Sequence, residues 1–206
     1  MKYAQYIALC LLLLVAWRRS DRLTYNRHIK RLEYASVQRH GDIIFLGDSH
    51  ISLGQWQSLL RRPDAGNEGY NGATSLSLIG PLQHVLAASP DTVYIMCGIN
   101  NILQEYSRSY FLADISNMVT TLKGRGTTPI VHHILYVGRK YPNSRQVNAT
   151  VIQWNKSLDS ICKGEGVTVI NLNSLLSPRG YLDHQYAQPD HIHLNTTAYR
   201  LWASML

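Results

Sequence analysis

The chain has 206 residues, of which 45% are hydrophobic, and a formal net charge of +7. This length can form one well-buried core, and the lack of repeats or low-complexity linkers favours a single globular domain. The charge is uneven: residues 1–40 carry eight Lys or Arg against two acidic residues, a net +6, whereas residues 41–206 carry twelve against eleven, a net +1. A nearly neutral domain argues against nucleic-acid binding.

The first residues predict a segment that associates with a membrane, because the stretch from Tyr6 to Trp17 is apolar. We interpret residues 1–20 as a hydrophobic anchor or signal segment, and residues 21–40 as a basic juxtamembrane arm that anionic headgroups would attract. A buried helix is the third alternative. An uncleaved anchor is favoured because Ala16 is followed by Trp and Arg rather than by a cleavage site, although the stretch is short for a membrane span.

Apolar runs and helical patterns alternate through the rest of the chain. Runs rich in β-branched residues predict buried strands at 42–47, 91–97, 129–137 and 167–172, with a further short strand around 66–69. Helical stretches are expected at 51–61, 74–88, 107–124, 147–163 and 195–205. Such alternation predicts an α/β domain over residues 41–206, a three-layer α/β/α sandwich with a central parallel sheet.

The most informative motif follows the first predicted strand, where the sequence reads Gly47-Asp48-Ser49. A serine at the point where a buried strand turns into a helix has its hydroxyl at the carboxyl edge of the sheet, the usual place for a reacting group in an open α/β fold. The same three residues also suit an ordinary turn and helix cap. Ser49 is therefore a candidate nucleophile that needs support from other residues.

Three further blocks provide that support. They are Asn67–Gly72, Gly98–Asn101 and Asp190–Asn195. Each block alone also suits a turn or a cap. Together and in this order they resemble the SGNH (GDSL) hydrolase superfamily, and the likeness spans residues 42–206. The resemblance implies a flavodoxin-like fold and hydrolysis of carboxylic esters.

Ser49, Asp190 and His193 have the chemistry of a catalytic triad. A serine hydroxyl is a poor nucleophile until a base takes its proton, and His193 can do so if a carboxylate holds its other ring nitrogen. Asp190 lies three residues earlier, so one turn-like segment can orient the imidazole toward Ser49. We therefore predict that Ser49 attacks, His193 transfers the proton and Asp190 orients His193.

The resemblance also implies an oxyanion hole. It assigns the backbone N–H of Ser49, the backbone N–H of Gly72 and the side-chain amide of Asn100 as donors to the oxyanion. Two departures from the family pattern are visible. Ala73 and Asn101 stand where many relatives have aspartate. Neither removes a predicted catalytic group, but both are expected to alter how the loops are braced.

Other residues are weaker candidates for substrate contact. Residues 138–148 form the longest polar loop of the domain and follow a predicted strand at the edge where Ser49 should lie. Arg139 and Tyr141 in this loop are expected to meet a polar or acidic substrate. His50 follows the nucleophile, and either contacts substrate or packs at the start of the helix.

A metal site is the alternative use of the C-terminal histidines. His184, Asp190, His191 and His193 form a cluster of imidazole and carboxylate groups, which suit zinc. The predicted triad already uses two of these residues, and the chain has neither HExxH nor paired-cysteine spacing. We therefore expect no metal and no organic cofactor.

These observations predict a serine esterase or acylhydrolase of the SGNH type that works through an acyl-enzyme. The resemblance implies short acyl esters, O-acetylated sugars or lysolipids as substrates. Two alternatives remain open: an O-acyltransferase that passes the acyl group to a carbohydrate, and an inactive membrane-tethered binding module. The positive-inside rule would keep the domain cytoplasmic because Arg18 and Arg19 follow the apolar stretch, but the resemblance favours export to the periplasmic or extracellular side.

Overall fold

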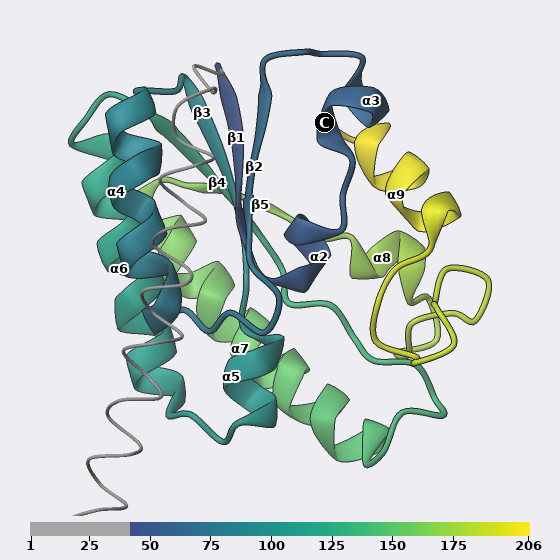
Figure 1. Ribbon diagram of the computed structural model, residues 1–206. Helices are drawn as coiled ribbons and strands as arrows, with labels where there is room; N and C mark the ends of the chain where they lie inside the picture. Colours follow the sequence, from purple (N-terminus) through teal and green to yellow (C-terminus); the bar gives the residue numbers. More distant parts are fainter. Residues whose placement is uncertain (1–41) are drawn as a thin grey trace, which may run out of the picture. The chain divides into compact units, whose positions relative to one another are not determined.

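The computed structural model describes residues 42–206 (Figure 1). The predicted anchor at 1–20 and basic arm at 21–40 lie outside the described residues. Within residues 42–206, no helix is long and apolar enough to cross a membrane.

A five-stranded parallel sheet forms the centre of the domain (Figure 1). Its strands lie in the order β2-β1-β3-β4-β5. Their bounds are β1 (Ile43–Gly47), β2 (Ala65–Gly69), β3 (Thr92–Met96), β4 (Thr128–His132) and β5 (Thr168–Ile170). Gly47 pairs with both Gly69 and Met96, so the carboxyl ends of the three strands are level. Loops from all three therefore leave the sheet at the same edge.

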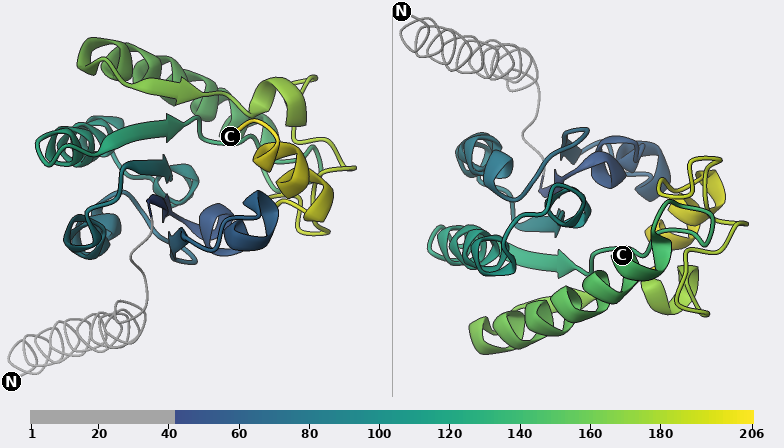
Figure 2. Two further views of the ribbon diagram at one scale, coloured as in Figure 1. Left: turned by 90° about the horizontal axis from the view of Figure 1, so that it is seen from above. Right: turned by 90° about the horizontal axis from the view of Figure 1, so that it is seen from below.

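Helices cover both faces of the sheet (Figures 1 and 2). The longer ones, α4 (Ile79–Ala88), α6 (Arg108–Lys123) and α7 (Ser144–Glu165), pack on one face. The other face is covered by α3 (Trp56–Leu60), α8 (Asn173–Leu176) and α9 (Thr196–Ala203). Three short elements follow β1, β2 and β3, in the segments that leave the carboxyl edge of the sheet: α2 (Ser49–Ser52), η1 (Leu76–Leu78) and α5 (Ile99–Leu103). The predicted three-layer α/β/α architecture is confirmed.

Two apolar cores follow from the alternation of side chains along the strands. Ile44 and Leu46 point into the core shared with α4, α6 and α7. Phe45, between them, points to the opposite core. There it stacks on Trp56 of α3 and on Tyr94 of β3, with ring centroids 3.9 and 4.9 Å apart. Because successive residues point to opposite faces, β1 is buried on both sides.

The predicted strand 129–137 was too long, since β4 ends at His132. Beyond it, buried asparagine side chains replace a neighbouring strand as partners of the backbone. Asn155 of α7 accepts from the N–H of Ile134 at 2.9 Å and donates to its carbonyl at 2.9 Å. Asn148 does the same for Val137. The apolar run continues, but its hydrogen bonds no longer belong to the sheet.

The predicted helix 51–61 was wrong as one element, because it is divided into α2 and α3. The side-chain amide of Asn67 donates to the carbonyls of Ile51 and Gly54, at 3.1 and 2.9 Å, and so satisfies the end of α2. The indole N–H of Trp56 also donates to Ile51, at 3.0 Å. These side chains stabilise a break that the apolar pattern does not reveal.

Candidate active site

Ser49 lies where β1 passes into α2. Asp48 caps this helix, because its carboxylate accepts from the backbone N–H of His50 at 3.0 Å. The backbone N–H of Asp48 donates to Met96 at the end of β3, also at 3.0 Å. The turn is thereby fixed to two adjacent strands. Ser49 itself is 7% exposed.

The structure brings Ser49, His193 and Asp190 into one hydrogen-bonded chain. His193 Nε2 lies 2.9 Å from Ser49 Oγ, and His193 Nδ1 lies 2.6 Å from Asp190 Oδ2. The two ring nitrogens therefore face the two partners that a triad requires. With Nδ1 protonated and donating to Asp190, Nε2 is free to accept the proton of Ser49.

The Asp190 carboxylate is held in its ionised form. Its Oδ1 accepts from the backbone N–H groups of Ile192 and His193, at 3.1 and 3.0 Å. Partial burial opposes the charge, but the hydrogen bonds from the His193 side chain and these backbone groups outweigh it. They lower the pKa of Asp190 to about 2. A carboxylate with this pKa can stabilise a positive charge on His193 at neutral pH.

The predicted oxyanion donors come from the loops that follow β2 and β3. Gly72 has a φ of 76°, in the left-handed region that favours glycine. Asn100 lies in α5, and its side-chain amide donates to the carbonyl of Ala73 at 3.0 Å. This hydrogen bond joins the second and third sequence blocks. The predicted positions Gly72 and Asn100 are thus held in adjacent loops.

The two departures from the family pattern have different structural outcomes. Ala73 is buried in the apolar core. Asn101 is fully buried, and its side chain accepts from the backbone N–H of Ser75 at 3.0 Å and donates to its hydroxyl at 2.9 Å. Ser75 in turn donates to Asp114 of α6 at 2.6 Å. An amide, unlike a carboxylate, provides both the donor and the acceptor that Ser75 needs.

His50 is 2% exposed and holds two parts of the site together. Its Nδ1 lies 3.2 Å from the Asp48 carboxylate and its Nε2 lies 3.0 Å from the carbonyl of Ile192, in the loop that carries the triad histidine. Burial opposes a charge on His50, but the hydrogen bond and charge of Asp48 outweigh it and raise its pKa. Both ring nitrogens are engaged within the protein, which favours the alternative that His50 packs at the start of the helix over the one that it contacts substrate.

Arg139 and Tyr141 do not form one wall. Arg139 lines a cavity beside the loop that carries Asp190 and His193, whereas Tyr141 lines a separate one with residues of α7. The backbone N–H of Tyr141 donates to the carbonyl of Gly138 at 3.0 Å, so the chain turns between the two cavities. The expectation that both residues meet a polar or acidic substrate stays a prediction.

No metal-binding cluster is formed by the described residues: no three His, Cys, Asp or Glu side chains lie close enough to hold an ion. His184 instead contacts Asp183, with 3.0 Å between His184 Nδ1 and the carboxylate. His193 contacts Asp190 and Ser49, as described above. The predicted C-terminal cluster is therefore divided between two separate pairs.

Comparison with known proteins agrees with this geometry. The model of the GDSL-like Lipase/Acylhydrolase family matches residues 45–201. No curated protein matches the chain. Among solved structures, a GDSL-like lipase from Bacteroides thetaiotaomicron is similar, with 18% identity, a TM-score of 0.69, and coverage of 79% of this chain and 83% of that one. The lipase/acylhydrolase from Enterococcus faecalis has 19% identity, a TM-score of 0.69, and coverage of 79% and 91%.

A catalytic mutant of an acetylxylan esterase from Geobacillus stearothermophilus is also similar, with 19% identity, a TM-score of 0.64, and coverage of 79% of this chain and 90% of that one. At these identities the solved structures show a common fold. The family model goes further, because it matches more than half of the chain and includes the nucleophile turn and the C-terminal His193. The chain belongs to the GDSL-like lipase/acylhydrolase family.

Proposed function

We propose that this protein is a serine ester hydrolase that cleaves carboxylic esters through an acyl-enzyme on Ser49. The observation that carries the proposal is the hydrogen-bonded chain of Ser49, His193 and Asp190, with distances of 2.9 and 2.6 Å. Family membership supports the ester as the reacting group. No metal or organic cofactor is needed for this chemistry.

The reaction has two halves. Ser49 Oγ forms a bond to the ester carbonyl carbon while His193 Nε2 takes the hydroxyl proton. The tetrahedral intermediate then expels the alcohol, which receives that proton from His193. Water attacks the acyl-enzyme in the second half, again with His193 as the base, and releases the acid and free Ser49. Asp190 stays ionised throughout and stabilises the imidazolium.

The negative oxygen of each intermediate would be bound by three donors. They are the backbone N–H groups of Ser49 and Gly72 and the side-chain amide of Asn100. The amide nitrogen of Asn100 carries two hydrogens, of which Ala73 accepts one. The second can therefore donate to the oxyanion. A preorganised donor of this kind is worth about 3 kcal/mol of transition-state stabilisation.

Short acyl esters and O-acetylated sugars are the substrates that we place first. One protein of the same fold is an acetylxylan esterase, which favours acetyl esters of carbohydrates as the class to test. Lysolipids stay a further candidate. The carbonyl oxygen would point toward Gly72 and Asn100, and the alcohol would leave on the side of His193, because His193 must protonate the departing oxygen.

The test is hydrolysis of p-nitrophenyl acetate by the full chain, with Ser49→Ala and Ser52→Ala beside it. Ser52 lies at the other end of α2 and serves as the matched control. We expect Ser49→Ala to lose at least about 10³-fold in kcat and Ser52→Ala to keep wild-type activity. Activity that disappears with a chelator, or survives in Ser49→Ala, would contradict the proposal. Faster turnover on addition of a sugar acceptor would indicate a transferase instead.

A further inference from the structure

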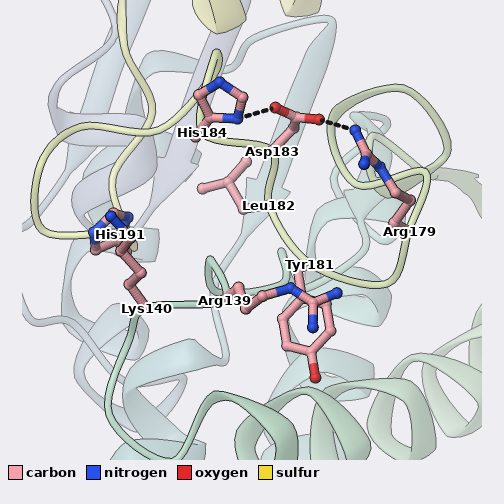
Figure 3. Close-up of a pocket in the computed structure, with 8 residues that line it drawn as sticks. All are labelled: Arg139, Lys140, Arg179, Tyr181, Leu182, Asp183, His184 and His191. Atoms are coloured by element: carbon pink, nitrogen blue, oxygen red, sulfur yellow. Dashed lines mark hydrogen bonds and ion pairs between the residues drawn. The ribbon is translucent and has the colours of Figure 1, made fainter.

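A cavity of about 410 Å³ is lined in part by His191, in the loop that also carries Asp190 and His193. Figure 3 shows the side chains that line this cavity. Cations, a carboxylate and imidazoles line most of it: Arg139, Lys140, Arg179, Asp183, His184 and His191. His191 follows Asp190 directly and precedes His193 by two residues. One wall of the cavity is therefore part of the segment that holds the predicted general base.

Backbone hydrogen bonds hold the walls of this cavity together. Gly138 donates to the carbonyl of His191 at 2.7 Å, which joins the loop after β4 to the triad segment. A side chain at Gly138 would meet His191 Cβ at 3.1 Å, so this close approach favours glycine. Leu182 donates to Val137 at 3.2 Å and so adds the third wall. The cavity is thus formed by three segments fixed to one another.

A buried asparagine of α7 also holds the segments that form the cavity together. Asn148 of α7 is 3% exposed, and its amide donates to the carbonyls of Val137 and Gly180, at 2.9 and 3.0 Å. These two residues precede, by one or two positions, Arg139 and Tyr181 on facing walls of the cavity. The position of the cationic side chains is therefore set by a buried contact in addition to the exposed loops.

The lining has an excess of positive charge. It contains three cations, Arg139, Lys140 and Arg179, and one carboxylate, Asp183, which gives 3 − 1 = +2 with the histidines neutral. Asp183 is already engaged, because it accepts from Arg179 at 3.5 Å and contacts His184 at 3.0 Å (Figure 3). Its charge is shared between these two partners.

Arg139 and Lys140 carry the unbalanced charge. Among residues 42–206, no carboxylate lies within ion-pair distance of either side chain. The Arg139 guanidinium lies over the ring of Tyr181, 4.4 Å from its centroid. This stacking uses the face of the guanidinium and leaves its N–H edge for an anion, which it can bind in a bidentate manner.

We propose that this cavity binds an anionic group, a carboxylate or a phosphate, on the alcohol part of the ester. The inference rests on the proposed function, because that function makes His193 the group that protonates the departing alcohol. The departing oxygen must then lie next to His193 Nε2, and His191, two residues earlier in the same loop, lines the cavity. The predicted oxyanion donors Gly72 and Asn100 come from other loops and do not line this cavity.

Three aryl acetates that differ in the charge of the phenol test this proposal. They are 4-acetoxybenzoate with a carboxylate, 4-acetoxyphenyl phosphate with a phosphate, and the neutral 4-acetoxybenzamide. The quantity to measure is kcat/KM for each anionic ester divided by kcat/KM for the neutral one, in the full chain. Comparing this ratio between variants cancels the different reactivities of the three phenols.

We expect Arg139→Gln to lower the ratio by about threefold to fivefold, and the double variant with Lys140→Gln to lower it further. Arg145→Gln is the matched control, since Arg145 is an exposed cation near the same loop but does not line this cavity. It should leave the ratio unchanged. Raising the salt concentration should reduce the wild-type ratio, because exposed charges are screened.

The outcomes separate the two proposals. If wild-type protein hydrolyses none of the three esters, the proposed function fails. If it hydrolyses the neutral ester but the double variant keeps the wild-type ratios for both anionic esters, the anion site is overturned. A fall in only one of the two ratios supports the site and identifies its ligand as a carboxylate or a phosphate.

Discussion

The two ends of the Ser49–His193–Asp190 chain are held in different ways. Ser49 is 7% exposed and stands on a turn fixed between β1 and β3. The side chains of His193 and Asp190 are 28% and 44% exposed and belong to a loop without regular structure. The sheet positions the proposed nucleophile, whereas hydrogen bonds of the loop position the proposed base. Substitutions in the loop that carries His193 and Asp190 should therefore lower turnover more than they lower the stability of the fold.

Contacts with distant parts of the domain hold the loop that carries His193 and the helix that follows it. His50 bonds to the carbonyl of Ile192 at 3.0 Å, and Gly138 donates to the carbonyl of His191 at 2.7 Å. The loop then leads into α9, whose Trp202 donates to the buried His132 at 3.0 Å. Each contact reaches a different part of the domain. The loop is thus tied to the nucleophile turn, to the loop after β4, and to the core under α9.

Asp190→Asn should have the largest effect on turnover of any conservative substitution at the loop end. The amide oxygen can still accept from the backbone of Ile192 and His193, so the loop should keep its conformation. The negative charge that stabilises the imidazolium is lost, and the preferred tautomer of His193 changes with it. We expect kcat on p-nitrophenyl acetate to fall by about 10³- to 10⁴-fold at an unchanged melting temperature.

A loss in Asp190→Asn smaller than about tenfold would show that the loop does not act through this carboxylate. The pH dependence gives a second check. The pKa of Asp190 is lowered to about 2, so its charge persists through the whole acidic range used in an assay. A wild-type decline in kcat between pH 7 and pH 4 should therefore report another group, and should not be explained by protonation of Asp190.

The hydrogen bond between His132 and Trp202 of α9 can be tested through the stability of the fold. It is buried and accepts from the Trp202 indole through Nε2, and burial lowers its pKa to about 3. The unfolded chain takes up this proton near the ordinary pKa of 6.5, so acid favours the unfolded state between these two values. The free energy of unfolding should fall by about 2 kcal/mol between pH 7 and pH 5 because of this residue.

The measurement is urea unfolding at the two pH values for wild type, His132→Gln and His184→Gln. The first variant removes the buried group and should show a weaker pH dependence than wild type, even though it is less stable at pH 7. His184 is 90% exposed and should leave the dependence unchanged. If the free energy of unfolding depends equally on pH in wild type and in His132→Gln, protonation of His132 is not what destabilises the fold in acid.

Local patterns in the sequence predicted residues at both ends of the Ser49–His193–Asp190 chain. The run before Gly47, the glycine–aspartate–serine turn and the spacing of Asp190 and His193 are short-range features, and the structure brings these groups within hydrogen-bond distance. The parallel sheet follows from the same kind of pattern, an alternation of apolar runs and helices. Such features depend on neighbours in the chain, so they can be recognised without a structure.

The contacts that organise the loops could not be predicted in this way. Asn148 and Asn155 replace strand pairing after β4, but their side chains come from α7, 11 and 21 residues further along the chain than their partners. Asn101 looks like a cap in the sequence and proves to brace Ser75 across 26 residues. Polar side chains of this type have no periodicity, and their partners are set only by the tertiary fold.

His50 links the turn that carries Ser49 to the loop that carries His193. Its substitution is expected to change kcat least of the variants in this loop and turn. Its ring lies 5.8 Å from that of His193, and it links Asp48 beside the nucleophile to Ile192 beside the base. His50→Phe keeps a ring of similar size but removes the donor to Ile192. We expect kcat to fall about tenfold with little change in KM, because the base would be displaced from Ser49 while the substrate walls stay in place.

His50→Gln provides the matched control for this positioning role, since its amide can again donate to the carbonyl of Ile192. It should recover most of the kcat lost in His50→Phe, and the rate at which a fluorophosphonate labels Ser49 should follow kcat across the three proteins. A merely structural role would lower the folded fraction and leave the labelling rate of the folded protein unchanged. If both variants lose stability equally and keep wild-type labelling rates, the nucleophile turn and the histidine loop are positioned independently.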